Sequence, residues 1–102
     1  MDYQVRLSRS ARLDIEDIVR YISLDDADQA LRFGRLLIQS TKTLRQFPQR
    51  GRIVPEFGDT YLREIVVRAY RIVYRVNHDQ SLIEVIRVWH AARGVPNITP
   101  LD

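Results

Sequence analysis

The sequence predicts a single α+β domain, with a helical hairpin packed on one face of a small, mainly antiparallel sheet. Two stretches in the first half repeat apolar residues at helical spacing, and three segments in the second half have the composition of strands. The chain has 102 residues, which suffices for one hydrophobic core. Residues 1–102 are therefore expected to form one domain.

The first elements are a short strand and a helix. Residues 3–7, YQVRL, alternate apolar and polar side chains as a strand does. Ser8 or Ser10 then offers a side-chain oxygen that can cap a helix N-terminus. The helix that follows places its apolar residues on one side, at Ala11, Ile15, Ile18 and Ile22.

A second helix follows after a short interruption at residues 24–26, LDD. Asp26 and Gln29 resemble a capping box in which Asp replaces Ser. The apolar stripe of this helix is Ala30, Phe33, Leu37, Thr41 and Leu44. Because the turn is so short, the two helices should form an antiparallel hairpin.

The second half of the chain predicts a three-stranded meander. Residues 45–60 contain two Pro and two Gly and are expected to form a long connection. The three strand-like segments are 61–67, 70–76 and 82–89, and their joins are short enough for hairpins. The tail, 95–102, is expected to be irregular.

Strand alternation assigns the side chains to two faces. In 70–76 it puts Tyr70, Ile72, Tyr74 and Val76 on one face, and Arg71, Val73 and Arg75 on the other. In 82–89 it puts Val85, Arg87 and Trp89 on one face, and Leu82, Glu84, Ile86 and Val88 on the other. We expect the helices to cover one face and arginines to line the other.

Composition excludes several kinds of site. Without cysteine there is neither a disulfide nor a thiolate metal site, and two histidines, His78 and His90, are too few to predict a zinc site. The four glycines form no phosphate-binding loop, so no metal and no cofactor are expected. Asp14, Glu16 and Asp17 have the spacing of a solvated helix face rather than of a catalytic carboxylate pair. The chain shows no membrane span or signal-peptide pattern, so a cytoplasmic location is expected.

Positive charge is concentrated in the middle of the chain. Residues 29–78 hold ten basic and three acidic side chains, although the whole chain has a net charge of only +3. Fifteen of the sixteen basic residues are arginine, whose planar fork suits carboxylates and phosphates. This segment is a candidate docking surface for an acidic partner.

Arginines and one histidine also gather on the predicted strands and just after them. The set is Arg63, Arg71, Arg75, Arg87, His90 and Arg93. Such side chains could stabilise a phosphate in a metal-free ribonuclease, with His90 as general acid or base. They could equally form a protein docking patch, and the residues by themselves leave both interpretations open.

Five segments together resemble the RelE/ParE toxin superfamily, and more narrowly its ParE-type, plasmid-stabilisation branch. They are SRSARLDIEDIVRYI (8–22), PQRGRIVPE (48–56), LRE (62–64), YRIVYRV (70–76) and VWHAAR (88–93). The resemblance covers roughly residues 3–95. It implies a bacterial toxin that arrests growth and is neutralised by a cognate, ParD-like antitoxin, with operator DNA bound only through the antitoxin.

The superfamily implies two activities: RelE-type toxins cut messenger RNA on the ribosome without a metal, and ParE-type toxins poison DNA gyrase. RelE-type nucleases place two lysines on the strand equivalent to 61–67, where this chain has Leu62 and Glu64. Arg71 matches a catalytic arginine, but Ala91 and Asn97 replace a second arginine and a tyrosine. The resemblance therefore favours a gyrase inhibitor that is not an enzyme.

Two alternatives stay open: a RelE-type endoribonuclease that uses Arg71, His90 and Arg93, and a non-toxic relative that only binds. For the favoured interpretation we expect Arg63, Arg71 and Arg75 to bind the antitoxin's acidic tail. Trp89, His90 and Arg93 are expected to bind the target.

Overall fold

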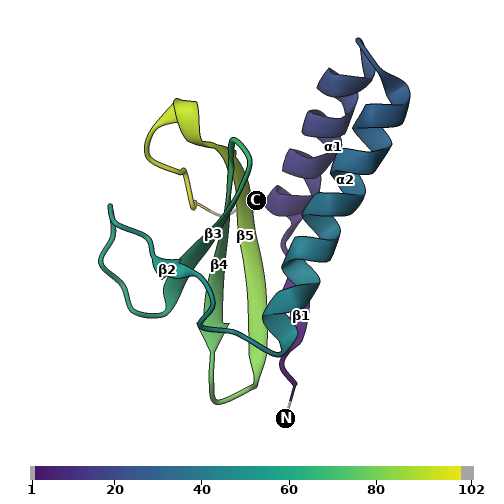
Figure 1. The fold of residues 1–102 in the computed structure, drawn as a ribbon. Coiled ribbons are helices and arrows are strands. Elements are labelled where there is room, and N and C mark those ends of the chain that lie inside the picture. The colour runs from purple at the N-terminus through teal and green to yellow at the C-terminus, as the bar shows by residue number, and fades with distance from the viewer. Residues whose placement is uncertain (1, 100–102) are drawn as a thin grey trace.

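The computed structural model of the chain describes residues 2–99 (Figure 1). Its elements are β1 (Gln4–Leu7), α1 (Arg9–Ser23), α2 (Ala27–Lys42), the 3₁₀ turn η1 (Thr43–Arg45), β2 (Arg52–Ile53), β3 (Leu62–Val67), β4 (Tyr70–Asn77), β5 (Leu82–His90) and the 3₁₀ turn η2 (Ala91–Arg93). This order confirms the predicted strand, helical hairpin and three-stranded meander. Within the tail expected to be irregular, residues 95–99 form no helix or strand, and 100–102 lie outside the described residues.

The strands form one sheet in the order β1-β5-β4-β3-β2. All neighbours are antiparallel except β1 and β5, which are parallel and are separated in the chain by the helical hairpin and by β2, β3 and β4. The two-residue strand β2, at Arg52 and Ile53, lies inside the segment expected to be only a connection. Of the helices within residues 2–99, none has the length and apolar character needed to cross a membrane.

Both helices begin where the sequence predicts. The Ser8 side chain accepts a hydrogen bond from the backbone N–H of Ala11 at 3.1 Å, so Ser8 rather than Ser10 caps α1. Asp26 caps α2 by accepting from the N–H of Gln29 at 3.0 Å. The expected apolar stripes face the sheet: only Ile22 among their members is partly rather than fully buried.

The sheet is covered on both faces. The helical hairpin packs on one side, and the loop between β2 and β3 and the C-terminal segment lie on the other (Figure 1). On the helix side the strands contribute Ile65, Ile72, Tyr74, Val76, Ile83, Val85 and Val88 to the main core. A smaller cluster on the opposite face contains Val54, Leu62, Val73 and Ile86, with Ile98 packed against it. We call this opposite face the arginine face, because Arg71 and Arg75 project from it beside Val73.

The face assignment predicted for β5 is correct as far as Ile86 and wrong from Arg87 onward, because the strand contains a β-bulge. Val73 pairs with Arg87 while Tyr74 pairs with Val85, so Ile86 is an extra residue. One extra residue reverses the alternation of every later side chain. Arg87 and Trp89 therefore share the arginine face, and Val88 turns toward the helices.

Tyr74 holds the long connection between α2 and β3 against the sheet by hydrogen bonds to its backbone. It is fully buried, and its hydroxyl donates to the Pro48 carbonyl at 2.8 Å and accepts from the Gly51 N–H at 2.9 Å. Burial raises the pKa of Tyr74, which keeps the hydroxyl protonated as a donor. A Cβ on Gly51 would lie 2.5 Å from the Glu64 carbonyl oxygen and 2.6 Å from the Tyr74 hydroxyl.

Gly51→Ala should therefore destabilise the protein by about 2–3 kcal/mol, because a backbone carbonyl and a buried ring must both move. Gly58→Ala is the matched control: Gly58 has a φ of 64° and open space around it, so only a backbone cost of about 1 kcal/mol is expected. Urea unfolding of both variants measures the difference. Equal destabilisation would contradict the steric argument.

Candidate functional site

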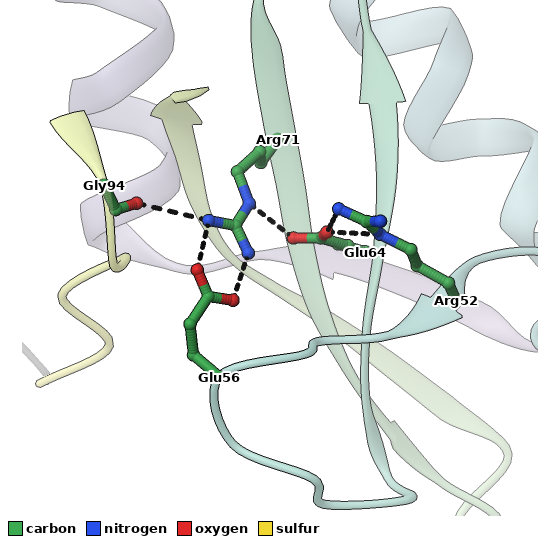
Figure 2. Close-up of polar contacts among 5 residues, drawn as sticks. All are labelled: Arg52, Glu56, Glu64, Arg71 and Gly94. Atoms are coloured by element: carbon green, nitrogen blue, oxygen red, sulfur yellow. Dashed lines mark hydrogen bonds and ion pairs between the residues drawn. The ribbon is translucent and has the colours of Figure 1, made fainter. Parts of the chain in front are cut away.

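The most completely buried charge in the described chain belongs to Glu64. This residue comes from β3 on the arginine face, and its side chain has no exposed area. Its Oε1 accepts from Arg71 Nε at 2.7 Å, and its Oε2 accepts from Arg52 Nε at 2.7 Å and lies 2.6 Å from Arg52 Nη2 (Figure 2). A carboxylate can be buried so deeply only when it is paired in this way.

Arg71 connects Glu64 to two further segments. Its guanidinium makes a bidentate pair with Glu56, at 2.8 Å from Nη1 and 2.6 Å from Nη2, and Nη1 also donates to the Gly94 carbonyl at 3.2 Å (Figure 2). The Arg71 side chain is only 8% exposed. Its hydrogen bond lowers the pKa of Glu56 to about 2, and in return the pKa of Arg71 is raised, first by Glu56 and then by Glu64.

These contacts form one charge network: Arg52, Glu56, Glu64 and Arg71, with the Gly94 carbonyl. Two guanidinium groups face two carboxylates, so the opposite charges balance. The network joins β2, the loop before β3, the central strands and the C-terminal segment. Arg52 and Glu56 were not among the predicted site residues, because in sequence they sit in an irregular connection; only their place opposite the strands reveals their role.

The three arginines predicted to bind the antitoxin do not lie together. Arg75 shares the arginine face with Arg71; its side chain is 48% exposed and lies 3.9 Å from Asp59. Arg63 pairs with Tyr74 across the strands and therefore lies on the helix side, where it donates to the Gly51 carbonyl at 2.9 Å. Among these three, Arg71 already has its guanidinium bound by internal carboxylates.

The residues predicted to contact the target divide between the two faces as well. Trp89 is buried on the arginine face, with the Arg93 guanidinium 3.8 Å and the Arg87 guanidinium 4.8 Å from its ring centre. His90 turns to the helix side, where its ring lies 5.0 Å from that of Tyr70. Its Nδ1 accepts the N–H of Ala92 at 3.1 Å, which caps η2.

Arg87 is held by a carboxylate expected to be solvated. Asp14 on α1 accepts from Arg87 Nε and Nη2 and from the Val88 N–H, each at 2.8 Å. The Asp14 side chain is only 12% exposed, so this expectation is wrong. The helical spacing places Asp14 beside the apolar stripe, but the sequence contains no sign that the edge of β5 lies there.

The arrangement contains few of the parts of a catalytic centre. In residues 2–99 no cluster of three or more His, Cys, Asp or Glu side chains could hold a metal ion. Arg71 and His90, which the nuclease alternative needs together, lie on opposite faces of the sheet. The arginine available at the surface of this region is Arg93, stacked on Trp89.

Sequence comparison now decides the family. The profile described as "ParE toxin of type II toxin-antitoxin system, parDE" matches residues 5–95. The chain belongs to the ParE toxin family. It is thus a type II toxin of the RelE/ParE superfamily, as the resemblance implied. A separate comparison with curated proteins found no significant match.

Solved structures with the same fold include both branches of the superfamily. The chromosomal ParDE toxin–antitoxin system from P. aeruginosa matches with a TM-score of 0.71 and 20% identity, covering 86% of this chain and 95% of that one. The RelBE2 toxin–antitoxin complex from Mycobacterium tuberculosis matches at 0.67 and 19%, covering 88% and 99%. A mutant of the E. coli toxin RelE in the free state matches at 0.65 and 18%, covering 92% and 88%.

Removing Arg71 should be far more costly than removing an exposed arginine of the same strand. Arg71→Met leaves the buried Glu64 with Arg52 alone, and we expect a loss of about 3–5 kcal/mol in the free energy of unfolding. Glu64→Leu combined with Arg71→Met should cost less than Arg71→Met alone, because no buried carboxylate is then left with only one of its two arginine partners.

Arg75→Met is the control for these two variants. Arg75 lies on β4 and on the same face as Arg71 but is exposed, so its loss should cost about 0.5 kcal/mol. Urea denaturation at one pH compares all four proteins. An Arg71→Met variant as stable as the Arg75→Met variant would show that the charge network does not support the fold.

Proposed function

We propose that this ParE family member inhibits DNA gyrase and does not cleave messenger RNA. The observation that carries the proposal is the buried Glu64, which stands where RelE-type nucleases carry a lysine and is already saturated by Arg71 and Arg52. The comparisons support the toxin family and leave the choice of target to this chemical argument.

A nuclease must stabilise the negative charge that develops on the scissile phosphate, and it does so with positive donors aimed at that charge. Glu64 would oppose such charge. Arg71, the one nuclease position that this sequence retains, directs its donors at Glu64, Glu56 and the Gly94 carbonyl instead. A phosphate could reach Arg71 only by displacing Glu56, whose pKa of about 2 keeps it charged at neutral pH.

A RelE-type ribonuclease is the second candidate, favoured by the structural likeness to the E. coli toxin RelE. In that case His90 would have to act without Arg71 beside it, since His90 lies on the other face of the sheet, and only Arg93 shares the face of Arg71. This separation is why we place the ribonuclease second.

For the gyrase inhibitor, we assign target contact to the end of the sheet where β5 passes into η2. Arg93 is exposed and stacks on Trp89, which holds its guanidinium at the surface, and His90 opens toward the helix side. The cation–π contact limits the motion of Arg93, so less conformational entropy is lost on binding.

We also infer an antitoxin partner, as in the RelBE2 and ParDE systems of similar fold, which would carry any contact with operator DNA. Arg63 and Arg75 are assigned direct contact with its acidic tail, one on each face, as suits a segment that wraps the toxin. Arg71 supports this surface indirectly, because its donors are bound to Glu56 and Glu64.

Pulse labelling of DNA and protein synthesis, in the first minutes after induction without the antitoxin, tests the target. DNA synthesis should fall first, and Arg93→Glu should remove the effect while its circular dichroism spectrum stays that of the parent. If protein synthesis falls first, the ribonuclease candidate replaces the gyrase inhibitor. If neither falls, the chain is a relative that only binds.

Titration with the antitoxin tests the two contact arginines. Arg63→Ala and Arg75→Ala should each weaken binding by about threefold to tenfold, as expected for charged contacts at the rim of an interface. Arg12→Ala, which removes an exposed arginine of α1, is the control and should bind as the parent does. Unchanged affinity in both variants would remove Arg63 and Arg75 from the interface.

A further inference from the structure

An open groove of about 540 Å³ lies between α2 and the turn that joins β3 to β4. The residues that line it are Ile22, Gln29, Arg32, Phe33, Leu36, Arg68, Ala69 and Tyr70. In Figure 1 this is the region where the upper part of the helical hairpin stands beside the β3–β4 turn. None of the predicted site residues lines this groove.

The floor of the groove is apolar and consists of side chains that already pack against one another. The rings of Phe33 and Tyr70 lie 5.6 Å apart and tilted to each other, and Phe33 is buried. Ile22 packs against the core below, and Leu36 is 36% exposed at the side. An apolar side chain entering here would find aromatic and aliphatic surface without rearranging the core.

The rim of the groove is basic. Arg68 lies over the Phe33 ring at 5.7 Å, and its φ of 53° is a backbone conformation rare for a residue other than glycine. Arg32 stands on the α2 side of the groove. Within residues 2–99, six arginines form ion pairs with carboxylates, and neither Arg32 nor Arg68 is among them. Both charges are therefore available to a carboxylate from outside.

The groove is continuous with the target-contacting end of the sheet. Tyr70, which forms one wall, also places its ring 5.0 Å from that of His90. The Ala91 N–H donates to the Ala69 carbonyl at 2.8 Å, so η2 is tied to the turn that borders the groove. A ligand on Tyr70 would stand directly beside His90.

We propose that this groove binds an acidic amphipathic segment of the antitoxin, with an apolar side chain on Phe33 and Tyr70 and carboxylates on Arg32 and Arg68. The proposal rests on the proposed function, because it names the site at which that partner acts. Charge decides the occupant: an apolar floor lies between two guanidinium groups that form no ion pair with a carboxylate of residues 2–99. It therefore matches apolar and acidic side chains on one peptide face. A second copy of this chain would bring a net positive charge against the same rim.

The position of the groove also suggests how the partner neutralises the toxin. A segment bound on Tyr70 covers the helix-side surface of His90, so antitoxin and target compete for one end of the sheet. Neutralisation then follows from occlusion and needs no change in the fold.

Titration of the full chain with the full-length antitoxin tests the site. Arg32→Glu and Arg68→Glu, both at exposed positions, should each weaken binding by about tenfold or more, because attraction becomes repulsion. Arg35→Glu is the matched control: the same charge change on α2, three residues away, in a position that lines a different groove. It should bind within about twofold of the parent.

The outcomes separate the two proposals. If the parent chain itself does not bind the antitoxin, the proposed partner is wrong. If the parent binds and Arg35→Glu loses affinity while Arg32→Glu and Arg68→Glu do not, the segment docks on the outer side of the hairpin and the groove assignment is overturned. If all three variants bind as the parent does, the assignment is overturned as well.

The two histidines provide an independent test of occlusion. His78 lies in the β4–β5 turn, at the opposite end of β5 from His90. Carbethoxylation by diethylpyrocarbonate, followed by peptide mass spectrometry, should be slowed at His90 by the antitoxin, with a smaller change at His78. The Arg68→Glu variant should lose this protection at equal antitoxin concentration. Unprotected His90 in a saturated complex would overturn the occlusion mechanism.

Discussion

The burial of Glu64 is the constraint on which the arginine face depends. A carboxylate with no exposed surface is tolerated only beside compensating charge, and Arg71 and Arg52 supply it from two neighbouring strands. Arg71 in turn holds Glu56 from the loop and the carbonyl of Gly94 from the C-terminal segment. One ionic network thus anchors two segments that lack regular secondary structure of their own, on a face that the helices do not cover.

The bulge at Ile86 makes this arrangement possible. It brings Arg87 and Trp89 to the same face as Arg71, so that the C-terminal segment meets a continuous surface of aromatic and guanidinium groups. Arg87 binds both Asp14 of α1 and the carbonyl of Asn97, and thereby links the helical hairpin to the tail around the edge of β5. The two faces of the sheet are thus coupled through side chains as well as through the shared strands.

The arginines therefore fall into two groups, according to whether a carboxylate of the described chain binds them. Arg71 and Arg87 are held by internal carboxylates and shape the molecule, whereas Arg32, Arg68 and Arg93 have no carboxylate partner within residues 2–99 and are available to other molecules. The same internal pairing that stabilises the face also removes the donors that phosphate chemistry would need. The ParE fold in this respect supports the surface arginines, and the two recognition sites that we propose lie at its edges, where β5 ends and where α2 faces the β3–β4 turn.

Local pattern in the sequence was enough to predict the α+β class, a first cap at Ser8 or Ser10, a second at Asp26, both helical stripes and the meander, because these follow from short-range signals. The resemblance to the RelE/ParE superfamily, rather than periodicity, pointed to Glu64 and Arg71 as positions that bear on the choice between the two toxin activities. Only the tertiary structure could reveal β2, the bulge at Ile86 and the pairing of Asp14 with Arg87. Each depends on contacts between residues distant in sequence, and a one-residue bulge leaves no periodic signal. The sequence therefore determined which charges the chain carries, and the fold decided which of them are paired, because pairing depends on distance in space.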